Sequence, residues 1–208
     1  MDPRCAVCAN NLAAYLLNHP SPSSAQLAEA EHLARAAVAL NPDYDSSYST
    51  LGAILASRGD DSGAEAAFAH AIRLAPDRIA ATANLGALYA RQGRYAEALP
   101  LLRRASEKEP GDPGLRRNLG FALRDGGTVR ARAGQLDEAV ALFQEAARVI
   151  PDDPELHRNF GLALWEQGQR EAARLHLERA AALRPADTGI QGLLARFRAD
   201  PDHAPALR

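Results

Sequence analysis

The segment Asn-Leu-Gly-Ala-Leu-Tyr at residues 84–89, together with Gly-Arg-Tyr-Ala-Glu-Ala at residues 93–98, decides the fold of this chain. Apolar and small residues recur within each half at helical spacing. Gly93 stands between the two halves, where a helix should end and the chain should turn. The two segments therefore predict two helices joined by a tight turn.

The same sequence pattern recurs along most of the chain, and prolines mark the boundaries between its copies. A proline cannot continue a helix, so each one indicates the end of a unit. These prolines are Pro42, Pro76, Pro110, Pro151 and Pro185. They recur every 34 places, except that the interval from Pro110 to Pro151 is seven places longer. A small residue follows ten places after each of the first four, at Gly52, Gly86, Gly120 and Gly161.

Each unit predicts one pair of antiparallel helices. The small residues let the two helices touch, and another glycine separates the two halves, at Gly59, Gly93, Gly134 and Gly168. One helix pair cannot cover its own apolar faces, so neighbouring pairs must stack. β-branched residues are sparse, which argues against a sheet. The sequence therefore predicts an all-α stack of helix pairs.

The phrases at 84–89 and 93–98, and Asn-Phe-Gly-Leu-Ala-Leu at 159–164, resemble those of the tetratricopeptide repeat (TPR) family. The resemblance covers nearly the whole chain. It implies a right-handed α-solenoid of about five helix pairs with a C-terminal capping helix. The tryptophan that opens the family's repeat is missing, and its place is taken by Tyr48, Thr82, Arg116 and His157.

We expect seven segments along the chain. These are a degenerate first unit with a long turn at 1–42, repeats at 43–76, 77–110, 111–151 and 152–185, a capping helix at 186–199 and a flexible tail at 200–208. Asp2-Pro3 predicts the start of the first helix. Ser23 or Ser24 should cap the second helix with its side-chain oxygen.

The unit at 111–151 contains seven extra residues, which the proline spacing places around 124–130. Seven residues are close to two helical turns, so an insertion of this size preserves the helix face. We therefore expect an elongated first helix. A loop or kink at the glycines 126–127 is the alternative, because each glycine weakens a helix by roughly 1 kcal/mol.

The resemblance also implies a groove lined by the first helix of each pair. Asn84, Asn118 and Asn159 are predicted at the same groove position, and Asn11 begins the series. A carboxamide both donates and accepts hydrogen bonds, so it can bind a peptide backbone. This series is similar to the asparagine ladder of O-linked N-acetylglucosamine transferases. The alternative is that each asparagine bonds a neighbouring helix.

The predicted groove is basic and aromatic in its second half. Arg117, Arg124 and Arg158 should lie there, near Phe121 and Trp165. Guanidinium groups bind carboxylates bidentately, and an aromatic ring provides an anchor. This composition predicts a peptide partner with acidic and apolar residues. The alternative is that the arginines pair with Glu155 and Glu166 on a solvated face.

Composition and charge favour neither nucleic acid nor membrane as a partner. The net charge is −2 and the sequence pI is about 6.3, so the chain has no overall attraction to nucleic acid. No apolar run approaches the length of a membrane span. We expect a cytoplasmic protein if Met1 is the natural start, and an extracytoplasmic one if the chain is a domain excised from a longer protein.

Cys5 and Cys8 are the only pair of residues that could carry reactivity. A redox site of the thioredoxin type needs a strand-led fold, a c-type haem site needs His where Ala9 stands, and a zinc site lacks a second ligand pair. We therefore expect structural cysteines, either free or joined in a local disulfide. The six histidines show no metal-ligand spacing, and we expect no metal and no cofactor.

These observations predict a binding protein rather than an enzyme. The leading hypothesis is a scaffold that binds an extended peptide or partner protein in the groove. One alternative is an accessory domain excised from a larger membrane-tethered protein or transferase. Another is a self-assembling scaffold that associates through the exposed apolar ends of the repeat array.

Overall fold

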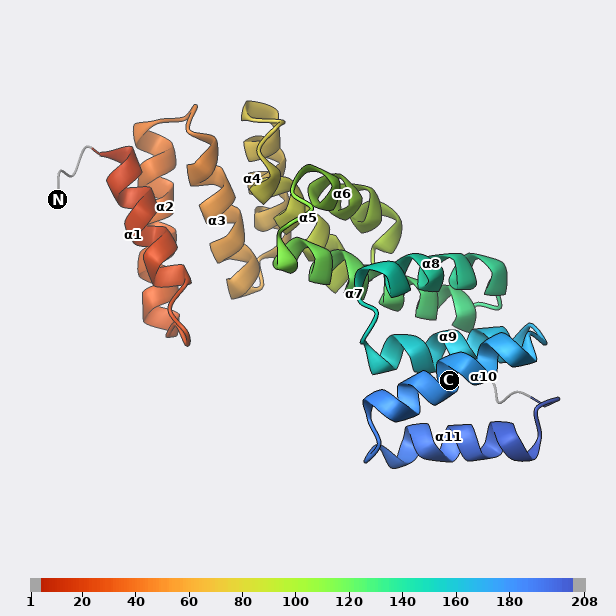
Figure 1. Cartoon of the computed structure of the whole chain (residues 1–208). Coiled ribbons are helices and arrows are strands. Elements are labelled where there is room, and N and C mark those ends of the chain that lie inside the picture. The colour runs from red at the N-terminus through yellow and green to blue at the C-terminus, as the bar shows by residue number, and fades with distance from the viewer. Residues whose placement is uncertain (1–4, 204–208) are drawn as a thin grey trace. The chain divides into compact units, whose positions relative to one another are not determined.

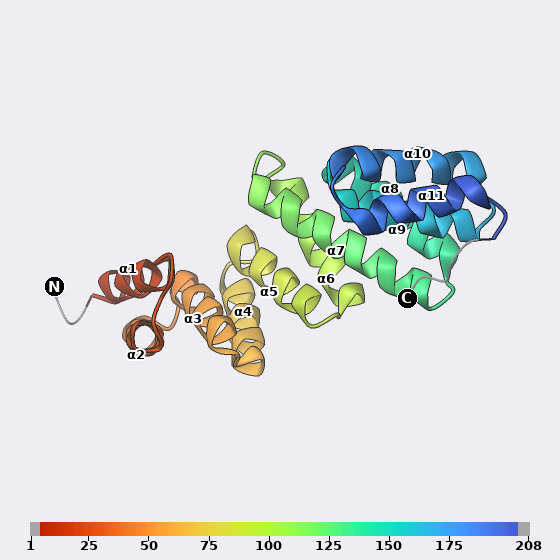
Figure 2. The ribbon, with the colours of Figure 1, turned by 90° about the horizontal axis from the view of Figure 1, so that it is seen from below.

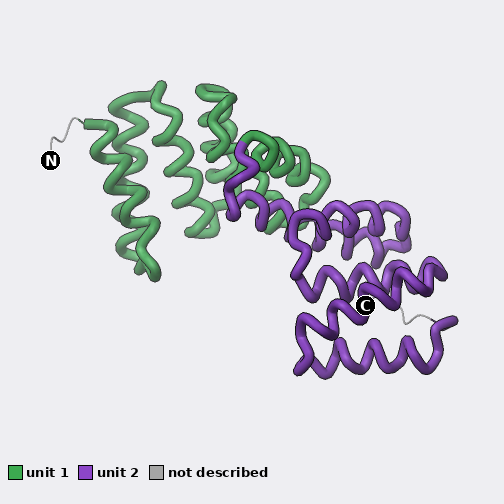
Figure 3. Tube along the Cα trace, viewed as in Figure 1, with its two compact units in different colours: residues 1–108 green, residues 109–208 purple. Residues whose placement is uncertain are grey.

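The computed structural model describes residues 5–203, and this part of the chain is helical with no strand (Figure 1). The predicted all-helical fold of stacked helix pairs is confirmed. The chain divides into two compact units, residues 1–108 and 109–208 (Figure 3).

Unit 1 holds three helix pairs, and each pair packs on the next. Its helices are α1 (Ala6–Leu17), α2 (Ser24–Leu40), α3 (Asp45–Arg58), α4 (Asp61–Leu74), α5 (Ile79–Arg91) and α6 (Tyr95–Lys108). Two apolar clusters hold these helices together. One is centred on Phe68 between Leu55 and Leu85, and the other joins Ala13, Ala30 and Ile54. Burying such side chains stabilises the stack by about 1.5–3 kcal/mol for each large residue.

Unit 2 holds two helix pairs and a last single helix. Its helices are α7 (Pro113–Arg132), α8 (Leu136–Val149), α9 (Pro154–Glu166), α10 (Arg170–Leu183) and α11 (Thr188–Ala199). α8 packs on α9, and α11 packs on α10. In Figure 2, seen from below, α8, α9, α10 and α11 overlap, whereas α7 runs beside them.

Local sequence signals set the helix ends. Ser23 caps α2, and its hydroxyl accepts from the Gln26 amide while the Gln26 side chain accepts from Ser23 N–H, which confirms the predicted cap. The glycines between paired helices have φ of 75–84°, a left-handed conformation that side chains disfavour. The predicted helix start at Asp2-Pro3 lies outside the described residues, and α1 begins at Ala6.

α7 is one continuous helix of 20 residues, so the chain forms a longer helix and not a loop at 126–127. In other repeats a glycine of the first helix packs on a large side chain of the second helix, so closely that an added Cβ would overlap it. These pairs are Gly52 with Phe68, Gly86 with Leu102, and Gly161 with Leu177, and the interval along the chain is the same in each.

The equivalent contact in unit 2 is made by Gly127, and not by Gly120 as the proline spacing predicts. A Cβ on Gly127 would lie 2.8 Å from the ring of Phe143, which follows Gly127 at the same interval as in the other pairs. Gly120 packs on Ile150 instead. The extra two turns therefore lie at the N-terminal end of α7, before the repeat register begins, and not at 124–130.

A histidine pair lies between α9 and α10. His157 Nε2 is 2.8 Å from the Pro151 carbonyl oxygen, so it donates there, and Nδ1 then accepts from His176 Nδ1–H at 2.9 Å. The His176 ring also packs on Phe160, with 4.0 Å between ring centroids. Burial, first, and repulsion from His157 when both rings are protonated, second, lower the pKa of His176 from its usual 6.5 to about 4.

Gly127→Leu tests the helix register. A leucine here would overlap the buried Phe143 ring, so the free energy of unfolding should fall by about 1–3 kcal/mol in urea denaturation followed by circular dichroism. Gly192→Leu on α11 is the matched control, because no atom lies within 4 Å of a Cβ there. The control should be neutral or stabilising by up to about 1 kcal/mol. Equal effects would contradict the assigned register.

His176 should make the stability of unit 2 depend on pH. Its pKa is lower in the folded chain, so unfolding takes up a proton at acidic pH. The contribution of neutral His176 to the stability of unit 2 is complete above pH 6.5, and it is lost as pH falls toward about 4. Melting temperatures measured across this range should fall less for His176→Gln than for wild type. His32→Gln, at an exposed site on α2, is the control and should behave as wild type.

Candidate functional site

A hollow of about 300 Å³ lies on the face shared by α3 and α5 in unit 1. Its lining comes mainly from the first helices of two repeats, through Ala53, Ala56, Phe68, Asn84, Ala87, Leu88 and Arg91. Asn84 is exposed and forms no hydrogen bond with residues 5–203. Arg91, by contrast, is paired with Asp61. The hollow therefore combines small apolar walls with one carboxamide whose donors and acceptor are available.

A second, more polar hollow of about 220 Å³ lies between the N-terminal ends of the same two helices. It is lined by Asp45, Ser46, Ser49, Thr50, Arg78, Ala80 and Ala81. Arg78 bonds both Asp45, at 3.2 Å, and the Ser46 hydroxyl, at 3.1 Å. Both hollows follow α3 and α5, so we define this surface, residues 45–56 with 78–91, as the α3–α5 face.

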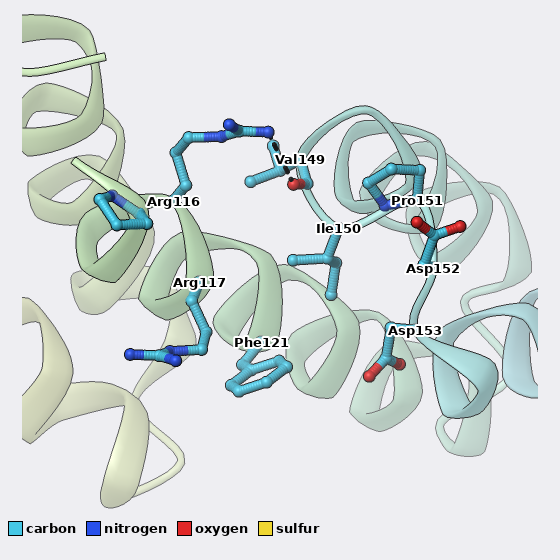
Figure 4. Close-up of a pocket in the computed structure, with 9 residues that line it drawn as sticks. Arg116, Arg117, Phe121, Val149, Ile150, Pro151, Asp152 and Asp153 are labelled. Atoms are coloured by element: carbon cyan, nitrogen blue, oxygen red, sulfur yellow. Dashed lines mark hydrogen bonds between the residues drawn. The ribbon is translucent and has the colours of Figure 1, made fainter. Parts of the chain in front are cut away.

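Unit 2 contains a hollow of about 330 Å³ between the N-terminal part of α7 and the α8–α9 connection (Figure 4). Arg117 and Phe121 form one side with Pro113 and Arg116, and the other side is formed by Val149, Ile150, Pro151, Asp152 and Asp153. The structure thus brings together two of the predicted site residues, Arg117 and Phe121. We call this surface the α7 hollow.

Arg124, another predicted site residue on α7, is already paired with residues of this chain. Arg124 bonds Asp125 at 2.7 Å and Asp153 at 3.2 Å, and its guanidinium lies 4.8 Å from the Phe121 ring centroid. Burial lowers the pKa of Arg124, but the two carboxylates outweigh it and the net pKa is raised. Arg124 therefore holds α7 to the start of α9 and is not available to a partner, unlike the sequence-based prediction.

Trp165 is also unavailable, although the sequence predicts it as an aromatic anchor. Only 2% of the residue is exposed, and its ring packs edge-on against Phe197 of α11. Its indole N–H donates to the Pro201 carbonyl at 2.7 Å. The segment after α11 thus covers the place where a partner would bind. The remainder of the predicted flexible tail, 204–208, lies outside the described residues.

The asparagines of unit 2 do not form the predicted series. Asn159 Nδ2 donates to Thr128 on α7 at 3.0 Å, and Asn159 Oδ1 accepts from Arg158, which also pairs with Glu155. Asn159 therefore follows the alternative, a bond to a neighbouring helix. Asn118 is exposed and bonds no described residue, but the residue 34 places before Asn159 is Asp125. Asn118 consequently lies outside the repeat register.

The cysteines lie at the start of α1. Cys5 and Cys8 are joined as a disulfide, and the Cys8 amide donates to Cys5 Sγ at 3.1 Å, so Cys5 also caps the helix.

The spacing of the histidines in the sequence did not predict the contact between His157 and His176, because these residues lie on different helices. Residues 5–203 contain no group of three or more side chains that could hold a metal ion. No helix in that range is long and apolar enough to cross a membrane.

Comparison with known structures supports the fold. The chain aligns with the crystal structure of YrrB, described as a TPR protein with an unusual peptide-binding site, at a TM-score of 0.69 and 22% identity over 92% of each chain. It aligns with the structure of MamA, residue 41 to the end, from Desulfovibrio magneticus RS-1 at a TM-score of 0.66 and 20% identity, covering 90% of this chain and 98% of that chain. At such identities these similarities show the fold alone.

Comparison with sequence families identifies the chain. No curated protein sequence matches it significantly. Three family models, each of the tetratricopeptide repeat, match residues 23–79, 77–149 and 130–197, so together they span almost all of the described chain. Together the matched ranges run from α2 to α11. The chain belongs to the tetratricopeptide repeat family.

Proposed function

We propose that the chain is a protein-interaction scaffold that binds an extended segment of a partner protein along the α3–α5 face, with Asn84 hydrogen-bonded to the partner's backbone. One observation carries this proposal. Asn84 is exposed, has no partner among the described residues, and lines a hollow of about 300 Å³.

The chemistry of the carboxamide fits a peptide backbone. Asn84 can donate to a peptide carbonyl and accept from a peptide N–H at once, whatever side chains the peptide carries. Ala53, Ala56 and Ala87 leave space beside it that a partner side chain can fill. The hydroxyls in the adjoining hollow offer further hydrogen bonds to a segment that continues along both helices.

The polar groups on this face suit recognition rather than catalysis. An amide and hydroxyls bind neutral backbone groups, and Arg91 and Arg78 are held by carboxylates of the chain itself. The peptide-binding description of the similarly folded YrrB provides a precedent for such a role. The same face would serve the chain alone or as an accessory domain of a larger protein.

Peptides selected from a random display library on the full chain test this proposal. Their affinities for variants can be measured by fluorescence anisotropy. Asn84→Ala removes two hydrogen bonds worth about 0.5–1.5 kcal/mol each, so it should weaken binding by about 5- to 150-fold. Ala87→Phe should weaken it by filling the hollow.

Asn118→Ala is the matched control, because Asn118 is equally exposed but lies in unit 2, outside this hollow. It should bind the peptides as wild type does. If the peptides bind the Asn84→Ala and Ala87→Phe variants as tightly as they bind wild type, the binding site is elsewhere. Equal losses for Asn84→Ala and Asn118→Ala would favour the asparagine series instead.

A further inference from the structure

We infer that the α7 hollow of unit 2 is a second binding site, which takes a partner segment carrying an apolar side chain next to a carboxylate. This inference goes beyond the α3–α5 face, because the site lies in the other unit and uses a charge rather than a carboxamide.

The site exists because α7 is longer than the other first helices. α9 begins at Pro154, and the residue 34 places earlier is Gly120, so a helix of ordinary length would begin there. The added turns start at Pro113, after the Asp112 cap, and carry Arg116 and Arg117. A regular repeat would have neither arginine, so this extension supplies the charge of the α7 hollow.

The floor of the hollow is apolar and accessible. Phe121 is 38% exposed, so its ring is accessible to a partner. The α8–α9 connection faces it with Val149, Ile150 and Pro151 (Figure 4). Burying one leucine-sized side chain against such a surface is favourable, because apolar area leaves water. The volume of about 330 Å³ suits one or two residues of a partner segment.

The charge around this floor is positive once internal pairs are counted. Asp153 is held by Arg124, and Asp152 is held by Arg179 of α10. Arg116 donates only to the neutral Val149 carbonyl, at 3.4 Å, so its charge is not balanced.

Arg117 is exposed and has no hydrogen bond or ion pair with any described residue. Figure 4 shows its guanidinium extending away from Ile150, so the stem lines the hollow and the charge lies at the edge. A guanidinium in this position can bind a carboxylate through two parallel N–H groups. The bound segment would place its apolar side chain between Phe121 and Ile150, and its carboxylate at Arg117.

Two model peptides separate the charge from the shape of the ligand. They are acetyl-Leu-Glu-amide and acetyl-Leu-Gln-amide, which differ by one carboxylate of nearly the same size. Both can be titrated into the isotope-labelled full chain and followed by NMR chemical shifts. The shifts should cluster on α7 and the α8–α9 connection, and the Glu peptide should bind about two- to five-fold tighter, as expected of an exposed ion pair.

Two variants and a control complete the test. Arg117→Gln should abolish the preference for Glu, and Phe121→Ser should weaken both peptides. Arg196→Gln on α11 changes the net charge equally at another exposed site, and it should keep the preference. Asn84→Ala should have no effect, which separates this site from the α3–α5 face.

The inference is overturned if the two peptides bind equally, or if Arg117→Gln and Arg196→Gln have the same effect. Shifts confined to other helices would also overturn it, as would no shift at peptide concentrations up to about 20 mM, where millimolar binding would be detected.

Discussion

In the four helix pairs from α3 to α10, the structure depends on a close contact between a glycine of the first helix and a large side chain of the second helix. Gly52, Gly86, Gly127 and Gly161 each leave no room for a Cβ, because a phenylalanine ring or a leucine side chain occupies that space. The contact lets paired helices approach closely and fixes their relative register. The faces that remain free for binding follow from this register.

Much of the fold could be predicted from glycine and proline positions, because both residues have backbone requirements that act locally. The proline spacing, however, predicts the wrong position for the seven extra residues. Adding two turns at either end of α7 leaves the same helix face inward, so Gly120 and Gly127 both satisfy the apolar pattern. The packing of Phe143 on Gly127 distinguishes them, and so does the interval of seven residues from Gly127 to Gly134, which is also the interval from Gly52 to Gly59. The register error then moved Asn118 into a series to which it does not belong.

The candidate site could be predicted in part. Asn84, Arg117 and Phe121 lie on accessible surfaces, as helical spacing indicates, since exposure follows from position on an amphipathic helix. The sequence pattern did not predict that Trp165 is covered. The segment after α11 returns to contact it, and helical periodicity carries no information about such a contact. The pairing of Arg124 and Asn159 within the chain was not predicted either, because both residues bond to partners on other helices. The two units consequently present different chemistry: a neutral carboxamide on the α3–α5 face, and a free guanidinium beside exposed apolar side chains at the α7 hollow.

Recognition of a partner's backbone by the Asn84 carboxamide on the α3–α5 face is tested most directly by a crystal structure of the full chain with a tightly bound selected peptide. We expect an extended peptide lying along α3 and α5, with Asn84 Nδ2 within about 3 Å of a peptide carbonyl oxygen and Oδ1 similarly close to a peptide N–H. A peptide bound away from this face, or one that contacts Asn84 only through its side chains, would contradict the account.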